Sequence, residues 1–174
     1  MTAARRRDEI LQTLAGASGP VSAAALAACL GVSRQVVVGD VALLRAAGSP
    51  IVATPRGYVL GGGQEGGGVR CTVACRHGLD GLLDELYTVA DCGCGVLDVT
   101  VEHPVYGQLS GQLQVFSRYD ADVFWNALQK NGAQPLCSLT GDIHLHTLVC
   151  PDEARKARVL AALEEKGYLM GLEK

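Results

Sequence analysis

Four histidines and one glutamate after residue 68 have the side chains best suited to bind a metal ion. The histidines are His77, His103, His144 and His146. His144 and His146 are two residues apart in a segment, 142–150, whose pattern predicts a β-strand. Alternation along a strand places both imidazoles on one face, with Cα atoms about 6.6 to 7 Å apart. Two rings at that spacing can converge on one ion at about 2.0 to 2.1 Å each.

His77 follows an expected strand, and Glu85 lies two helical turns onward in an expected helix. Imidazole nitrogens with a carboxylate suit Zn, Ni, Fe or Mn and do not choose among them. A His-x-His pair is also what two solvent-facing strand histidines produce. The pattern therefore has two interpretations, a metal site or a pair of solvent-facing histidines.

The elements of residues 21–60 predict a DNA-binding module. Ser22 is an expected N-cap of a first helix that ends before Gly31, where a left-handed residue can turn the chain. Ser33 is the expected N-cap of a second helix that runs to about residue 47. The apolar face of this second helix is assigned to Val36, Val37, Val41 and Leu44.

Arg34 and Gln35 fall on the first turn of the second helix. In a helix-turn-helix this turn enters the major groove, where both side chains can bind base edges bidentately. Residues 51–60 predict a two-stranded wing with its turn at 55–57, which contains Arg56. A helical packing module without DNA-binding function is the alternative, but the wing favours DNA binding. The expected DNA contacts are Ser33, Arg34, Gln35 and Arg56.

Charge is distributed unevenly along the chain. The net charge is −3, but residues 1–60 hold six basic and three acidic residues, and the remainder holds nine and fifteen. This asymmetry fits a DNA-binding end joined to a part with another role. Arg5, Arg6 and Arg7 are interpreted either as an arm that contacts phosphates or as a solvated terminus. Because no apolar run approaches the about 20 residues of a membrane span and no signal peptide is evident, a cytoplasmic protein without membrane association is expected.

Seven cysteines, an odd number, argue against a disulfide framework in such a chain. Two pairs of cysteines, Cys71 with Cys75 and Cys92 with Cys94, are close enough in sequence to be considered as zinc ligands. Neither pair has the spacing of a zinc knuckle. They are interpreted mainly as small buried apolar residues.

A Gly-rich segment at 61–68 predicts a linker between a domain at 1–60 and a second domain at 69–174. The second domain alternates strand and helix patterns in the order β-α-β-β-α-β, followed by a closing helix. The fold class expected is mixed α/β (α+β), with a winged helix-turn-helix followed by a ferredoxin-like domain. A mixed α/β domain with a different strand order fits the same elements.

The sequence resembles the NiaR family of niacin-responsive repressors. Residues 31–48 and 55–60 are similar to the winged helix of biotin-repressor-type regulators, and the rest resembles the three-histidine (3H) domain. The segments that support this resemblance are Arg76-His77, Glu85-Leu-Tyr87, His103-Pro-Val-Tyr-Gly107 and His144-Leu-His146. Asp142, where a small residue is expected, and the cysteines at 71, 75, 92 and 94 depart from the family pattern, so whether thiolates tune or compete for the metal is left open.

The resemblance implies a metal ion held by His77, Glu85, His144 and His146, a homodimer formed through this domain, and nicotinic acid as corepressor of genes for NAD biosynthesis and niacin uptake. The dimer would place two reading helices about 34 to 36 Å apart on a palindromic double-stranded operator. Niacin would bind an open metal position or a bidentate Arg118, beside Tyr106 or Tyr119. His103 is assigned either to this ligand or to its own turn.

Two other functions use the same residues. In a metal-sensing repressor, the ion itself would be the signal. In a small metal-dependent hydrolase, Glu102 or Asp98 would act as general base. The chain lacks a nucleotide-binding loop, since residues 61–68 contain no Lys-Ser/Thr and open no helix. A regulator and not an enzyme is therefore expected.

Overall fold

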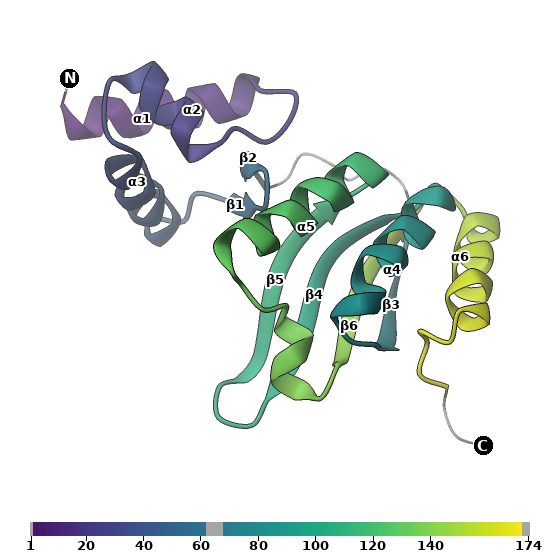
Figure 1. The fold of residues 1–174 in the computed structure, drawn as a ribbon. Coiled ribbons are helices and arrows are strands. Elements are labelled where there is room, and N and C mark those ends of the chain that lie inside the picture. Colours follow the sequence, from purple (N-terminus) through teal and green to yellow (C-terminus); the bar gives the residue numbers. More distant parts are fainter. Residues whose placement is uncertain (1, 62–67, 172–174) are drawn as a thin grey trace. The chain divides into compact units, whose positions relative to one another are not determined.

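The computed structural model describes residues 2–61 and 68–171 and divides the chain into two compact units, Met1–Glu65 and Gly66–Lys174 (Figure 1). Most of the linker expected at 61–68 lies outside the described residues. Among the described residues no single helix is long and apolar enough to cross a membrane. The helices at Ala23–Leu30 and Arg34–Ala46 reach the length and apolar composition of a membrane span only when they are counted together, and the chain bends sharply between them.

The first unit consists of three helices and a two-stranded wing: α1 (Ala3–Gly16), α2 (Ala23–Leu30), α3 (Arg34–Ala46), β1 (Ile51–Thr54) and β2 (Gly57–Leu60). The expected helix starts are confirmed, because the hydroxyl of Ser22 accepts from the amide of Ala25 and that of Ser33 accepts from the amide of Val36. Gly31 has φ of 65°, and the α2–α3 pair bends by 105° at this turn. This angle is typical of a helix-turn-helix.

Two expectations for this unit are wrong. Val36 is 38% exposed, because the buried face of α3 is formed by Val37, Asp40, Val41 and Leu44. Arg6 and Arg7 are neither a free arm nor a solvated end. Arg6 Nε lies 2.5 Å and Arg7 Nη1 lies 3.5 Å from the carboxylate of Asp40, which is 4% exposed.

The second unit is a four-stranded antiparallel sheet with helices packed into one core. Its elements are β3 (Val69–Arg76), α4 (Leu79–Asp91), β4 (Gly95–His103), β5 (Gly107–Val115), α5 (Arg118–Asn131), the 3₁₀ helix η1 (Leu136–Thr140), β6 (Ile143–Cys150) and α6 (Glu153–Glu165). The expected β-α-β-β-α-β order with a closing helix is confirmed. The helix α5 is capped by Ser117, whose hydroxyl accepts from the amide of Asp120.

The strands lie in the order β3-β6-β4-β5, which corrects the ferredoxin-like expectation. A ferredoxin-like sheet has the first and third strands of the motif at its centre, whereas here the second and fourth, β4 and β6, are central. A helix about 10 to 12 Å wide covers two strand spacings of about 4.8 Å, so the crossover through α4 skips one position between β3 and β4. β6 fills that position because its alternate residues are buried, while the Gln- and Ser-containing β5 lies at the edge. The alternative of a different strand order is the one that holds.

Strand register determines which residues face the helices. His144, His146, Leu148 and Cys150 alternate on the buried face of β6, and their neighbours Ile143 and Leu145 face the other side. The buried side chains of the sheet join those of α4, α5 and α6 in one hydrophobic core. After α6, Leu169 forms an isolated bridge to Cys75 of β3.

All seven cysteines are free thiols. Cys75, Cys92 and Cys94 are buried, as expected, whereas Cys71 is half-buried. Cys75 differs from Cys92 and Cys94 in its surroundings, because Glu85 and a histidine of β6 lie close to its sulfur.

Candidate metal centre

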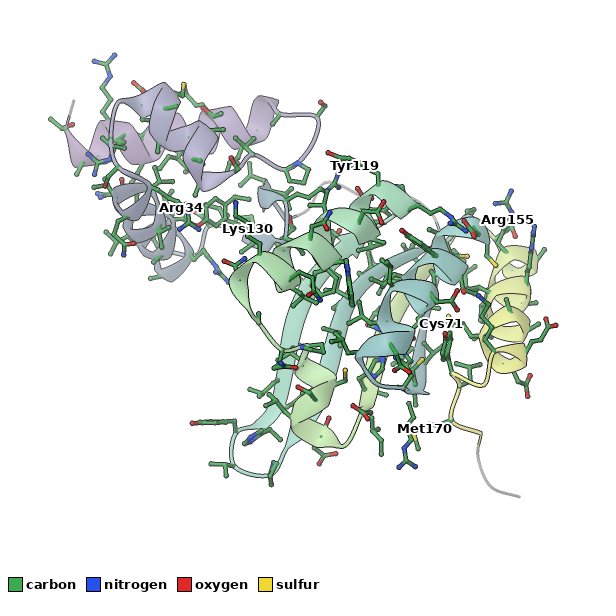
Figure 2. All side chains as sticks on the ribbon, viewed as in Figure 1. Arg34, Cys71, Tyr119, Lys130, Arg155 and Met170 are labelled. Carbon is green, nitrogen blue, oxygen red and sulfur yellow. The ribbon has the colours of Figure 1, made fainter. Side chains whose placement is uncertain are left out.

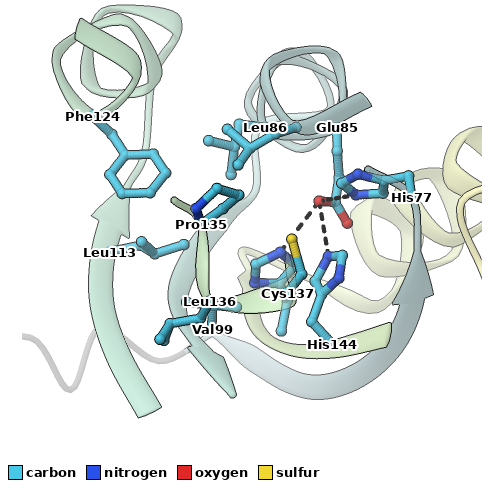
Figure 3. Close-up of a pocket in the computed structure, with 12 residues that line it drawn as sticks. His77, Glu85, Leu86, Val99, Leu113, Phe124, Pro135, Leu136, Cys137 and His144 are labelled. Carbon is cyan, nitrogen blue, oxygen red and sulfur yellow. Dashed lines mark hydrogen bonds and ion pairs between the residues drawn. The ribbon is translucent and has the colours of Figure 1, made fainter. Parts of the chain in front are cut away.

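Three histidines and Glu85 meet inside the second unit, on the helix-facing side of the sheet (Figure 3). The Nε2 atoms of His77, His146 and His144 lie 2.6, 3.2 and 3.4 Å from one oxygen, Oε2, of Glu85. Glu85, His144 and His146 are 1%, 3% and 4% exposed. The interpretation of His144 and His146 as solvent-facing strand residues is therefore wrong.

Each of the three rings is oriented by its other nitrogen. Nδ1 of His77 lies 3.0 Å from the carbonyl oxygen of Gly78, that of His144 lies 3.0 Å from the carbonyl of Asp142, and that of His146 lies 2.7 Å from the carbonyl of Asp98. A carbonyl oxygen only accepts, so Nδ1 carries the proton in each ring. In its neutral form each imidazole therefore presents an Nε2 lone pair toward Glu85, as metal-binding histidines do when a backbone carbonyl fixes their tautomer.

Two irregularities of the backbone supply those carbonyls. The pairing of β4 with β6 shifts register between Val96 and Asp98, and this bulge directs the Asp98 carbonyl at His146, while the Asp98 carboxylate accepts from the amide of Thr147. Asp142 has a left-handed φ of 69° and accepts at its carbonyl from both the His77 amide and the His144 ring. Its backbone conformation explains why a small residue was expected at this position.

Further residues that the sequence interpretation missed enclose His77. A Cβ on Gly81 would lie 2.9 Å from Cγ of the His77 ring, so only glycine lets α4 approach this ring. The ring of Tyr168 lies 4.9 Å from that of His77, and its hydroxyl donates to Asp84. A glycine one turn into a helix is a signal that sequence reading could have used, whereas the contact of Tyr168 depends on the path of the chain after α6.

Electrostatics at the centre favour a negative Glu85 beside positive partners. Burial opposes ionisation of Glu85, but the adjoining histidines hold the pKa of its carboxyl well below the ordinary value. Burial by itself lowers the pKa of His77 and of His146, yet Glu85 raises both above the ordinary value. The second carboxylate oxygen, Glu85 Oε1, is buried and has no hydrogen-bond partner among the described residues.

These residues fit a divalent transition-metal ion. Ligands about 2.0 to 2.2 Å from one ion lie about 3 Å apart, which is the range of the nitrogen–oxygen distances seen here. Three lone pairs that converge on a buried carboxylate need a cation between them, and the unpaired Oε1 offers a further donor. Imidazole and carboxylate donors match Zn, Ni, Fe or Mn.

Cys75 also lies at this centre. Burial and the nearby Glu85 raise the pKa of its thiol above the ordinary value. Its sulfur, a Glu85 carboxylate oxygen and a His144 ring nitrogen all lie within 4.8 Å of one another.

A cavity adjoins the four residues and extends away from them between apolar walls (Figure 3). Its free volume is about 30 Å³, about the volume of one water molecule. Phe124 of α5 stands across the cavity from His77 (Figure 3). The remaining lining is formed by Leu82, Leu86, Val99, Leu113, Pro135, Leu136 and Cys137, together with the metal-site residues.

The structure does not bring the other expected ligand residues to this cavity. Nδ1 of His103 accepts from the amides of Val105 and Tyr106, which is the turn-stabilising alternative, and Tyr106 is 74% exposed at the hairpin tip. Arg118 forms a bidentate pair with Asp91, at 2.7 and 2.5 Å, over the ring of Tyr87. Tyr119 is 70% exposed on α5 (Figure 2).

The expected DNA contacts lie on the surface of the first unit. Arg34 and Gln35 are exposed on the first turn of α3 (Figure 2), and Arg56 is half-buried at the wing turn. The hydroxyl of Ser33 is engaged as the N-cap of α3. Ser33 therefore orients the reading helix, while Arg34 and Gln35 extend from it.

Comparison with known proteins assigns both units. Residues 6–59 match the HTH domain and residues 70–172 match the 3H domain. The chain is 44% identical over 165 residues to the "Probable transcription repressor NiaR" of Thermotoga maritima, covering 95% of this chain and 93% of the relative. It is 40% identical over 169 residues to the "Transcription repressor NadR" of Bacillus subtilis, covering 96% and 94%.

Both relatives are named as transcription repressors, and the match runs through the DNA-binding and 3H domains alike. The residues of the metal centre lie inside the 3H match, and those of the reading helix lie inside the HTH match. This chain belongs to the NiaR family of transcription repressors and is a regulator rather than an enzyme.

Proposed function

We propose that this repressor senses nicotinic acid through a divalent metal ion held by His77, Glu85, His144 and His146, and that nicotinic acid acts as corepressor of genes for NAD biosynthesis and niacin uptake. The observation that supports this most strongly is the convergence of three Nε2 atoms on one buried carboxylate. The family resemblance supplies the identity of the effector.

The proposed ligand would enter at this cavity beside the metal, and the cavity walls would move apart to admit it, because about 30 Å³ is smaller than an aromatic ring. When bound, the ion supplies a fixed positive charge that attracts a carboxylate or a pyridine nitrogen. The aromatic ring would then lie against Phe124, Val99 and Leu113, which are apolar and line the same cavity. The polar end of nicotinic acid is thereby matched to the histidines and its planar ring to the apolar wall.

The ligand and metal claims are tested by titrating metal-loaded protein with nicotinic acid and nicotinamide in a calorimeter. We expect nicotinic acid to bind and His144→Ala to lose metal and ligand together, while His103→Ala, a histidine outside the site, keeps its metal. Phe124→Ala should keep the metal but weaken nicotinic acid binding about tenfold, since one aromatic contact is worth about 1.5 kcal/mol. Stoichiometric metal in His144→Ala would remove His144 from the ligand set.

A metal-sensing repressor is separated from a niacin sensor by its DNA binding. A duplex recovered by in-vitro selection with this protein serves as the operator. We expect full affinity only when metal and nicotinic acid are both present. Full affinity with metal alone would replace the niacin proposal by the metal-sensing one.

The reading role of α3 is tested on the same duplex. Arg34→Ala should lower sequence-specific affinity while nicotinic acid binding is unchanged, because a bidentate base contact is worth about 1 to 3 kcal/mol. Arg45→Ala, an exposed arginine in the last turn of the same helix, is the matched control. Equal affinity of Arg34→Ala and the parent would refute this role.

The homodimer in this proposal is assigned to the sheet face opposite the helices. Ile143 and Leu145 on this face are 40% and 37% exposed. Basic Arg76 at one edge and acidic Glu102 on β4 are both exposed on the same face, so a twofold axis can pair unlike charges. Leu145→Glu should yield a monomer in sedimentation, whereas Val105→Glu at the exposed hairpin tip should remain dimeric. A dimeric Leu145→Glu protein would exclude this face.

A further inference from the structure

Cys75 combines complete burial with a position next to two proposed metal ligands. It is 0% exposed, and the β3–β6 pairing places it directly opposite His144. Both residues face the helix-covered side of the sheet, toward Glu85. Its sulfur, a Glu85 oxygen and a His144 nitrogen form a set of three donors within 4.8 Å of one another.

We propose that Cys75 is a fifth ligand, bound as a thiolate, of the metal ion at this centre. This inference rests on the proposed function, in which the histidines and Glu85 hold that ion. Two donors at about 2.3 Å for sulfur and about 2.0 to 2.1 Å for nitrogen lie at most about 4.4 Å apart on one ion. The three donors therefore reach a common ion with a movement of less than about 1 Å each.

Binding through sulfur replaces the S–H bond by an S–metal bond, and the thiol proton leaves to solvent. No electron is transferred in this step. The thiolate adds a soft donor to a set of imidazoles and a carboxylate. Cys75 is thus a residue that biases the centre toward zinc and away from manganese.

Cys137 provides a matched comparison. It lines the cavity that adjoins the metal-binding residues and is 3% exposed, yet it does not belong to the close set of donors. A thiol buried in the same surroundings but outside the donor set separates metal ligation from burial.

Cobalt(II) titration followed by absorption spectroscopy tests the proposal on the full-length protein. The visible ligand-field band reports any bound cobalt, and the near-ultraviolet charge-transfer band reports a cobalt–thiolate bond. We expect the parent protein and Cys137→Ser to show both bands at one equivalent of cobalt. Cys75→Ser should retain the visible band and lose the charge-transfer band.

The spectrum of the parent protein tests for a metal–thiolate bond even if Cys75→Ser fails to fold. A visible band without a charge-transfer band would overturn the role of Cys75 and leave the metal site intact. No visible band at any cobalt concentration would refute the metal site itself, and the Cys75 proposal with it. A charge-transfer band that persists in folded Cys75→Ser would assign the bond to another cysteine and also overturn the proposal.

Metal competition gives a second measurement. Cys75→Ser should weaken zinc binding about 10- to 100-fold, at least as much as loss of an outer-shell partner. Manganese binding should change much less, because manganese prefers oxygen donors. An equal loss for the two metals would contradict the proposed bias.

Discussion

Asp40 of the first unit and Glu85 of the second are both buried carboxylates beside basic side chains, and the two are neutralised in different ways. Asp40 in α3 is 4% exposed and is paired with two arginines of α1. Glu85 in α4 is 1% exposed and faces three imidazoles instead. Arginine is always protonated, whereas histidine is charged only below or near neutral pH.

The difference separates a structural pair from a candidate functional centre. Asp40 is satisfied within the chain, so its contacts fix α1 against α3 under all ordinary conditions. Glu85 and the neutral histidines are satisfied only by added protons or by a metal ion. A site that needs protons or a metal ion from solution can respond to their concentrations, whereas an ion pair that is complete within the chain cannot.

Removing the charge of Glu85 should have the largest effect. Glu85→Gln preserves the shape of the side chain but replaces a negative donor by a neutral one. We expect metal affinity to fall more than about 100-fold, beyond the loss caused by an outer-shell change. Elemental analysis after dialysis measures this loss, and Asp40→Asn serves as the matched control that keeps its metal. Parental metal content in Glu85→Gln would break the distinction between the two carboxylates.

The stability of the metal-free second unit should depend on pH, and bound metal should restore the stability that is lost at high pH. The raised pKa values of His77 and His146 provide stability that is present below their ordinary value of 6.5 and is lost as pH rises through the raised values. The lowered pKa of Glu85 provides stability that is present above its ordinary value of 4.5 and is lost on further acidification. In chelator, the unit should therefore be most stable between about 4.5 and 6.5 and weaker at pH 8.5.

Fluorescence of Trp125, the only tryptophan, follows thermal unfolding of the second unit selectively. Added zinc should raise the transition temperature much more at pH 8.5 than at pH 5.5, because protons and metal compete for the same nitrogens. Equal gains at the two pH values would show that metal does not bind through these imidazoles.

The two carboxylates also show where prediction from sequence succeeds and fails. Alternation along a strand places His144 and His146 on one face, and serine caps define the helices, because both depend on residues close in sequence. The pairing of Arg6 with Asp40 spans 34 residues and has no local pattern. The carbonyls of Asp98 and Asp142 depend on a bulge and on a left-handed backbone, which arise only when the strands pair.

The predictions of the strand order and of the ligand-binding residues are wrong for related reasons. Helix width requires a gap between β3 and β4 but does not say which strand fills it. His103 and Tyr106 lie in a family-like segment and Arg118 follows a predicted strand, yet the hairpin and the Asp91 pair direct them away from the cavity. Their positions in the sequence therefore did not predict that they would lie close to the cavity.

Loss of the structural pair should have a moderate effect that is independent of metal. Asp40→Ala should lower the free energy of unfolding of the first unit by about 1.5 to 3 kcal/mol, the range for hydrogen bonds to charged groups. Helical circular dichroism during urea unfolding measures it, while Trp125 fluorescence should be unchanged. Asp8→Ala, an exposed acid on α1, is the control. A shift of the Trp125 transition would show that the two units are energetically coupled.

The smallest effect is expected at Gly39, the neighbour of Asp40 on the exposed side of α3. A Cβ there would have no atom within 4 Å, so Gly39→Ala should stabilise the first unit by about 0.5 to 1 kcal/mol. Ala42→Gly on the exposed face of the same helix should destabilise it by a similar amount, with urea unfolding as the measurement.

Gly39 lies one turn beyond Gln35, so a methyl group there is also placed toward the proposed DNA. If the helix backbone approaches the groove closely, Gly39→Ala binds the selected duplex more weakly although it is more stable, and this is the outcome we expect. Unchanged affinity would mean that the glycine has no role in DNA approach. The two measurements together separate the stability of the first unit, which its own arginine–aspartate pair provides, from the surface by which it would bind DNA.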